Sequence, residues 1–111
     1  MAPDGNHQAK KAAENQALLR EVNERIEELA RDAANPQFLC ECADESCTET
    51  IELSIAEYET ARSSPVRFPV KVGHLDRDVE RLVEENDRYA VVEKTGQAGE
   101  IARAMDPRSR A

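Results

Sequence analysis

The sequence predicts an α+β fold: one long N-terminal helix, followed by a small, mainly antiparallel sheet of about four short strands with two short helices. Three observations lead to this prediction. Apolar residues recur every three or four positions in the first 32 residues, but alternate with polar residues in several stretches between residues 36 and 94. Clusters of proline, glycine and serine separate these stretches. All aromatic residues fall between residues 38 and 89, which places the predicted core there.

The first predicted element is a helix from about Gln8 to Asp32, ended by Asn35-Pro36. Its apolar residues follow a 3-4-3 spacing that places them on one stripe, in register with Ala12 and Asn15: Leu19, Val22, Ile26 and Leu29. The stripe is narrow and spans about two and a half heptads. We therefore expect this helix to pair with a copy of itself, with a partner helix in a coiled coil, or with the body of the domain.

A β-hairpin is predicted next. Phe38, Cys40 and Cys42 alternate with their neighbours, so they share one face if this segment is a strand. Residues 48–53 alternate again, and the turn-like residues 43–47 connect the two stretches. The hairpin would therefore carry its thiols near the tip.

A helix is predicted to begin at Ser54, because Ser54 and Glu57 three residues later form a capping-box pattern. It should end at the Ser-Ser-Pro sequence that follows. Residues 66–72 then alternate between apolar and polar side chains, which is typical of a half-buried strand. Pro69 within them indicates a position at the edge of the sheet.

A second short helix and a final strand complete the predicted domain. Asp76 is a residue type that caps helices, and a helix is expected from there to about Asn86. Its buried stripe would consist of Val79, Leu82 and Val83. Residues 89–93 are expected to form the last strand.

The chain is predicted to have three parts: an N-terminal amphipathic helix over residues 1–35, a small α+β domain over 36–94 and a flexible tail over 95–111. The tail contains two glycines, a proline and scattered charge, which is typical of a mostly disordered segment. Within it, a helical turn is expected at residues 100–104.

Charge and composition narrow the classes of function. The net charge is −8, from 23 acidic and 15 basic residues, so the field of the protein would repel a nucleic-acid backbone. No run reaches the roughly 18 apolar residues of a membrane span. The N-terminus lacks an apolar signal-peptide region, and three cysteines make a poor disulfide framework. These features predict a cytoplasmic protein with metal-bound or free thiols.

The cysteines and one histidine suggest a metal site. Cys40, Cys42 and Cys47 lie within eight residues, and His74 follows a valine-rich predicted strand at a bend. Zinc prefers thiolate and imidazole ligands in a closed tetrahedral set, and three cysteines with one histidine form one of its usual structural sets. We therefore predict that Cys40, Cys42, Cys47 and His74 bind one structural Zn²⁺.

Several alternatives to this set remain open. Asp44, Glu49, Asp76 or a residue of another chain could replace His74 as the fourth ligand. A water molecule in that place would make the zinc catalytic. The thiols could also be core residues without a metal, or redox-active residues. The redox interpretation is disfavoured because the carboxylates between and beside the cysteines should hold the pKa of a thiol up.

Several segments resemble a family of small uncharacterised bacterial proteins. They are an F-x-C-E-C-x4-C-T-E core, here Phe38 to Glu49, and a V-G-H element, here Val72 to His74. The stretches Arg20 to Ile26 and Arg88 to Lys94 resemble the family too, so the resemblance covers about residues 14–94. It implies no established activity, but it implies that the three cysteines and His74 belong to one set.

Together these observations predict a non-enzymatic regulatory or interaction module that a structural zinc ion stabilises. Its partner would be another protein or a second copy of the chain, bound through the N-terminal helix; nucleic acid and membranes are not expected partners. The alternatives are a thiol- or metal-responsive redox sensor and a small zinc-dependent enzyme. No complete catalytic constellation is visible, and Glu52, Glu57 and Glu59 are interpreted as solvated surface groups.

Overall fold

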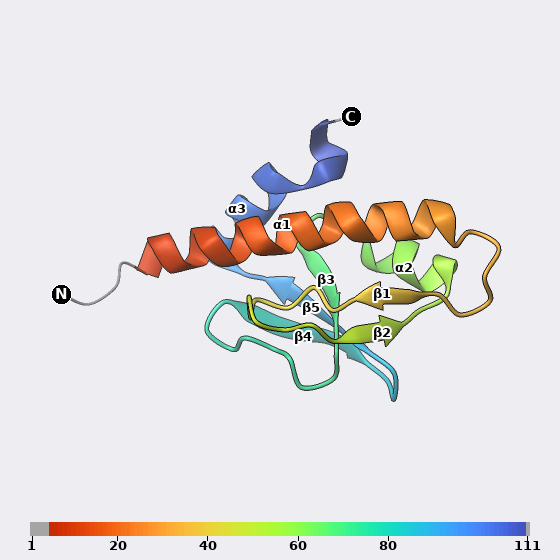
Figure 1. Cartoon of the computed structure of the whole chain (residues 1–111). Coiled ribbons are helices and arrows are strands. Elements are labelled where there is room, and N and C mark those ends of the chain that lie inside the picture. The colour runs from red at the N-terminus through yellow and green to blue at the C-terminus, as the bar shows by residue number, and fades with distance from the viewer. Residues whose placement is uncertain (1–4, 111) are drawn as a thin grey trace.

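The computed structural model of the chain describes residues 5–110 and shows an α+β fold, as the sequence predicts. Its elements follow in this order: α1 (Gly5–Leu29), β1 (Gln37–Leu39), β2 (Thr50–Glu52), α2 (Ile55–Ala61), β3 (Arg67–Val70), β4 (Glu80–Glu85), β5 (Ala90–Lys94), α3 (Gly96–Met105) and the 3-10 turn η1 (Pro107–Arg110). Five strands are described where about four were expected. Helix α1 runs along one side of the strands, with α3 beside it (Figure 1).

The strands form two small antiparallel sheets. β1 pairs with β2, with Phe38 opposite Ile51, and the other sheet has the order β3-β5-β4. Pro69 lies on the edge strand β3, as predicted, where a residue without an N–H group is tolerated. The two sheets meet because the chain leaving β1 runs beside β3, where the Glu41 N–H donates to the Pro69 carbonyl at 3.0 Å.

Two hydrophobic clusters lie on either side of β5. Alternation along this strand directs Ala90 and Val92 to one cluster and Val91 to the other. The first cluster combines residues of the larger sheet with two buried cysteines and one residue of α3: Cys40, Cys42, Val66, Phe68, Val70, Ala90, Val92 and Ala102. In the second, the rings of Phe38 and Tyr58 stack with their centroids 4.4 Å apart. The cysteines are therefore held against the larger sheet by ordinary core packing.

Helix α1 packs on the body of the protein through a mostly polar row. The helix itself is confirmed, but only part of the predicted apolar stripe, Leu19 and Ile26, packs against the body. The buried residues follow their own 3-4-3 spacing: Ala13, Gln16, Arg20 and Asn23. Leu18, Val22 and Leu29 are 59%, 41% and 76% exposed, whereas Leu19 and Ile26 are half-buried. The reason is that the body presents a buried carboxylate and backbone carbonyls to α1, and only polar side chains can pair with these groups.

Residues 76–86, predicted as a second short helix, contain strand β4 instead, so this prediction is wrong. The apolar residues fit a helical spacing, but pairing with β5 decides the conformation: Leu82 lies opposite Val92, and a bulge follows Leu82. A buried ion pair of 2.9 Å between Glu80 and Lys94 also joins the two strands. Neither interaction is visible in the local pattern, because β5 follows later in the chain.

The helical turn expected at residues 100–104 is confirmed, because these residues lie within helix α3. The expectation that the residues around this turn are mostly disordered is wrong for residues 96–105, which are all helical. Helix α3 packs against α1 and β5, and Ala102 is buried in the first cluster. Gly99 allows this approach, because a Cβ atom there would lie 3.0 Å from the Lys94 carbonyl oxygen. The small residues that are typical of a disordered tail therefore serve here to bring a helix close to the sheet.

The capping box at the start of α2 is confirmed. The Glu57 N–H donates to Ser54 Oγ at 3.1 Å, and the Ser54 N–H donates to Glu57 Oε1 at 2.8 Å. Arg88 adds two hydrogen bonds to the same carboxylate, at 2.6 and 3.0 Å. The hydrogen bonds from Arg88 lower the pKa of Glu57 to about 2. Glu57 is therefore a structural group and more than a solvated acid.

We expect Glu57 to make the stability of the protein depend on pH. Because its pKa is lower in the folded than in the unfolded chain, its contribution is fully present above about pH 4.5 and is lost as the pH falls toward about 2. Glu57→Gln should flatten the fall of the free energy of unfolding over this range and cost about 1 kcal/mol at pH 7. Urea unfolding at several pH values measures both effects. Glu100→Gln, at an exposed position of α3, is the control; an identical pH dependence in the wild type and Glu57→Gln would contradict the assignment.

Candidate metal centre

The hairpin loop between β1 and β2 carries the three cysteines. Cys40 follows β1 directly, and its N–H donates to the Glu49 carbonyl at 3.0 Å, which extends the pairing of the two strands by one step. The chain then turns back, and the turn is closed by the Cys47 N–H, which donates to the Asp44 carbonyl at 3.1 Å. Cys40 and Cys42 thus lie on the outgoing side of the loop and Cys47 on the returning side.

The loop between β3 and β4 supplies the histidine. The His74 N–H donates to the Lys71 carbonyl at 3.0 Å, which closes a tight turn. Gly73 has a φ of 90° in this turn, a conformation that residues with side chains rarely adopt. The glycine therefore allows the bend that brings the His74 ring to the cysteines.

The four predicted ligand atoms lie close together. The Sγ atoms of Cys40, Cys42 and Cys47 and one ring nitrogen of His74 are all within 4.8 Å of one another. His74 Nδ1 lies 3.5 Å from Cys40 Sγ and 3.6 Å from Cys47 Sγ. A tetrahedral zinc ion with Zn–S bonds of about 2.3 Å and Zn–N bonds of about 2.0 Å requires sulfur–nitrogen distances of about 3.5 Å. The donors and their spacing therefore fit a tetrahedral metal ion.

The site is partly buried, and one backbone hydrogen bond favours a thiolate ligand. Cys40 and Cys42 are buried, whereas Cys47 and His74 are half-buried, so the site lies at the surface with two sulfurs covered. The Lys71 N–H donates to Cys40 Sγ at 3.1 Å. Such a bond stabilises negative charge on sulfur and fixes the direction of the side chain.

One thiol has a strongly lowered pKa. Hydrogen bonding with the Cys40 thiol lowers the pKa of Cys42 to about 5, and the same contact raises the pKa of Cys40. The expectation that neighbouring carboxylates hold the thiol pKa values up is therefore wrong for Cys42. Contacts within the cluster dominate, and the carboxylate of Glu41, which stands between Cys40 and Cys42 in the sequence, points away from the sulfurs toward α1. The contact with Cys40 therefore favours the thiolate form of Cys42, the form that binds metals.

The acidic residues considered as fourth ligands have other partners. Asp44 Oδ1 accepts two hydrogen bonds within its own turn, at 2.7 and 2.9 Å, and Glu49 binds Lys71 Nζ at 2.9 Å. Asp76 accepts a hydrogen bond of 3.1 Å from the backbone of the following turn. Of the described residues, His74 completes the converging group and these three do not belong to it. Because a catalytic zinc keeps one position open, four protein donors favour a structural site.

An open cavity of about 390 Å³ lies against the site. Cys42 and His74 line it, together with Asp44 and Asp76. Small solutes can therefore reach one side of the cluster, although two of its sulfurs are buried in the core. The ligands are thus accessible to chelators and to oxidants.

A second group of acidic residues already binds an arginine side chain. Glu24, Glu27 and Glu59 place carboxylate oxygens within 4.8 Å of one another. Arg108 Nη2 lies 2.6 Å from Glu59, 2.9 Å from Glu24 and 3.7 Å from Glu27. We assign no metal to this group, because the guanidinium supplies the positive charge there. Glu59 is thus an ion-pair partner as well as a surface residue.

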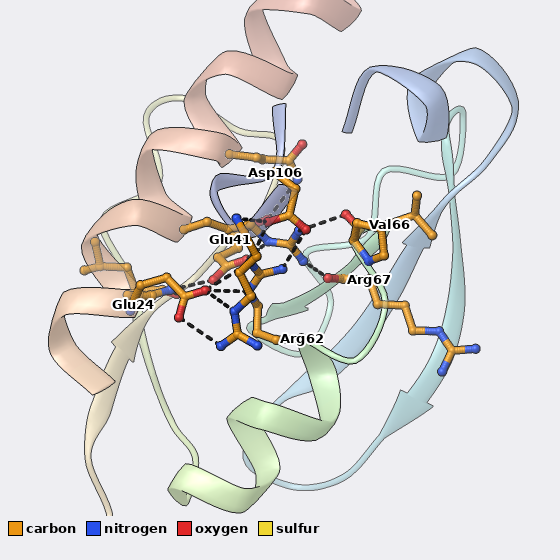
Figure 2. A network of polar contacts seen from close by, with 12 residues as sticks. Glu24, Glu41, Arg62, Val66, Arg67 and Asp106 are labelled. Carbon is orange, nitrogen blue, oxygen red and sulfur yellow. Dashed lines mark hydrogen bonds and ion pairs between the residues drawn. The ribbon is translucent and has the colours of Figure 1, made fainter. Parts of the chain in front are cut away.

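Glu41, between the two buried cysteines, belongs to a buried polar network that the sequence pattern did not reveal. Its carboxylate accepts hydrogen bonds from Arg20 Nε at 2.9 Å and from Asn23 Nδ2 at 2.8 Å. Figure 2 shows it near Arg62 and Asp106, which are joined by hydrogen bonds of 2.6 and 3.2 Å. Burial raises the pKa of Glu41, and the Arg20 guanidinium opposes this change. The sequence signal that could have revealed it is the spacing of the polar residues Gln16, Arg20 and Asn23, which lie four and three positions apart on α1.

The fold and the site define an α+β protein with three cysteines and one histidine placed so that they could hold a metal ion. Comparison with protein-family models, with curated proteins and with solved structures finds no match. The resemblance to a family of small bacterial proteins therefore stays a prediction. Within residues 5–110, no helix is long and apolar enough to cross a membrane.

We expect His74→Ala to weaken zinc binding at least tenfold, because the loss of one of four donors leaves the ion with an incomplete protein shell. Competition with a chromophoric chelator measures the affinity. His7→Ala removes the other histidine of the chain and should bind zinc like the wild type. Equal affinities of the wild type and His74→Ala would exclude His74 as a ligand.

Proposed function

We propose that this protein is a non-enzymatic regulatory or interaction module whose body is stabilised by one structural Zn²⁺, bound by Cys40, Cys42, Cys47 and His74. The observation that supports this most directly is the convergence of four donor atoms from two separate loops within 4.8 Å. Zinc is favoured because soft thiolates with an imidazole in tetrahedral geometry are its preferred ligands.

The ion would cross-link parts of the chain that have no regular structure to hold them. Residues 40–49 and 71–79 contain neither helix nor strand. A structural zinc site contributes roughly 10–16 kcal/mol of apparent binding energy, comparable to the roughly 5–15 kcal/mol of a whole domain's stability. For a chain of 111 residues with two small hydrophobic clusters, this contribution would be large.

The outward face of α1 supports a role in protein interaction. Leu18, Val22 and Leu29 are exposed there, and spacings of four and seven residues place them on one stripe. A helix of a partner protein or of a second copy could cover this stripe. A cytoplasmic location belongs to the same proposal, because a reducing compartment keeps thiols available for the metal.

We expect about one zinc ion per chain in wild-type protein purified without added metal or chelator, and little or none in Cys47→Ser. A strong chelator should lower the melting temperature and the circular dichroism signal of the wild type, because the two loops lose their cross-link. Metal analysis and thermal melting with and without chelator test both expectations. A folded wild-type protein that contains no metal and melts identically with chelator would overturn the proposal.

A thiol- or metal-responsive redox sensor is the second candidate, favoured by the accessibility of the site. Cys42 and Cys47 have Sγ atoms within 4.8 Å of each other, and the open cavity reaches Cys42. Hydrogen peroxide would oxidise the two thiols to one disulfide by accepting two electrons, and would itself be reduced to two molecules of water. Two ligands would then be lost, and the zinc ion would be released.

We expect a stoichiometric amount of hydrogen peroxide to release zinc and to join Cys42 and Cys47. A colorimetric chelator reports the released metal, and mass spectrometry reports the loss of two hydrogen atoms and the position of the disulfide. Denatured protein treated in the same way serves as the control for non-specific oxidation. Zinc that stays bound while the cysteines are oxidised elsewhere would eliminate the sensor, but would leave the structural role intact.

A further inference from the structure

We propose that Glu41 is a positioning residue that couples the metal centre to the docking of helix α1, so that zinc binding tightens the packing of α1 and zinc release loosens it. The inference rests on the proposed zinc site and names the element that this site would regulate. Glu41 contacts α1 through its carboxylate, and the two cysteines beside it belong to the metal cluster.

Three polar side chains of α1 form hydrogen bonds with the segment that carries Cys40 and Cys42. Gln16 Nε2 donates to the Glu41 carbonyl at 2.8 Å. The Glu41 carboxylate accepts from Arg20 at 2.9 Å and from Asn23 at 2.8 Å. Asn23 also exchanges two hydrogen bonds with the backbone of Leu39, at 2.8 and 3.0 Å. The docking of α1 therefore depends on the positions of residues 39–41 through five hydrogen bonds.

On the metal side, the ion would fix the same segment. Cys40 and Cys42 flank Glu41, and their sulfurs converge in the cluster while the Glu41 carboxylate meets α1. Neighbouring side chains of an extended segment point to opposite sides. An ion that holds both sulfurs therefore also sets the direction of Glu41. The Glu41 N–H is held in place by the Pro69 carbonyl, at 3.0 Å.

The inward face of α1 has little apolar surface with which to dock independently of these bonds. Among its described side chains, Ala13 is the buried hydrophobic one, and Leu19 and Ile26 are half-buried. Hydrogen bonds stabilise only while donor and acceptor stay aligned, and a buried carboxylate that loses its partners is costly. A relaxed segment 39–42 would therefore weaken the docking of α1. By linkage, a displaced α1 would weaken metal binding by the same factor.

Other contacts of α1 do not depend on the metal site, so the loss of zinc should loosen the packing of α1 but not detach the helix. Glu24 binds Arg62 at 3.0 Å and Arg108 at 2.9 Å, and neither bond passes through the loop that carries the ligands (Figure 2 shows the first). Helix α1 should therefore stay on the body after zinc is removed, with faster opening of its backbone hydrogen bonds. Strand β5, paired on both sides, should respond less.

The test measures zinc affinity and the protection of α1 in the full chain. Asn23→Ala removes three of the five hydrogen bonds, which hold the residues beside the ligands Cys40 and Cys42. It should weaken zinc binding about tenfold in chelator competition, the lower end of the range for groups that bond a metal ligand directly. Glu41→Gln keeps the shape of the side chain and should shift the affinity in the same direction. Arg25→Ala, on the exposed face of the same helix, is the matched control and should bind zinc like the wild type. In the wild type, chelation should accelerate amide hydrogen exchange in residues 13–23 more than in β5.

Each result decides for or against the coupling. Wild-type zinc affinity in folded Asn23→Ala and Glu41→Gln would overturn it, while the zinc site itself would stand. Exchange in α1 that does not change on chelation would overturn it as well. A wild-type protein that binds no zinc would remove the proposed function and the coupling together. If Asn23→Ala does not fold, Glu41→Gln and the exchange of the wild type give the answer.

Discussion

The buried ion pair between Arg20 and Glu41 is the interaction on which the arrangement of the protein most depends. Their side chains are 1% and 0% exposed, so neither charge can return to water unless α1 leaves the body. Desolvation lowers the pKa of Arg20 and raises that of Glu41, and the hydrogen bonds of the pair offset this cost. The Arg20 guanidinium also lies 3.8 Å from the centroid of the Phe68 ring. One arginine thus connects α1, the cysteine loop and the larger sheet.

Ion pairs also connect α1 with the C-terminal elements. Arg62, at the end of α2, joins Glu24 of α1 to Asp106, which follows α3. Arg108 in η1 forms an ion pair with the same residue of α1, Glu24. Because paired charges must meet in one register, whereas apolar surfaces tolerate sliding, this network favours a single orientation of the helices. The hydrophobic clusters hold the sheets together, and the polar network decides how the helices lie on them.

Local patterns predicted the features that local chemistry determines. The capping box at Ser54 and the edge position of Pro69 follow from the residues themselves, and the four candidate ligands were found from residue type and spacing. The buried face of α1 could not be predicted in this way, because it depends on Glu41, an acid that would ordinarily be exposed. Strand β4 likewise depends on pairing with β5, and α3 on the space that Gly99 leaves beside β5. These effects depend on residues far apart in the sequence, and neither helical periodicity nor composition can predict them.

The open edge of the larger sheet is protected against pairing with a further strand. Strand β4 forms this edge, where Arg81, Glu84 and Glu85 are exposed and a bulge follows Leu82. Charged and irregular edges resist the addition of a further strand, because a regular row of free N–H and C=O groups is not presented. The chain can thus display an apolar stripe on α1 without also offering a template for cross-β aggregation. An edge of this kind would therefore disfavour fibril growth from the sheet even at high protein concentration.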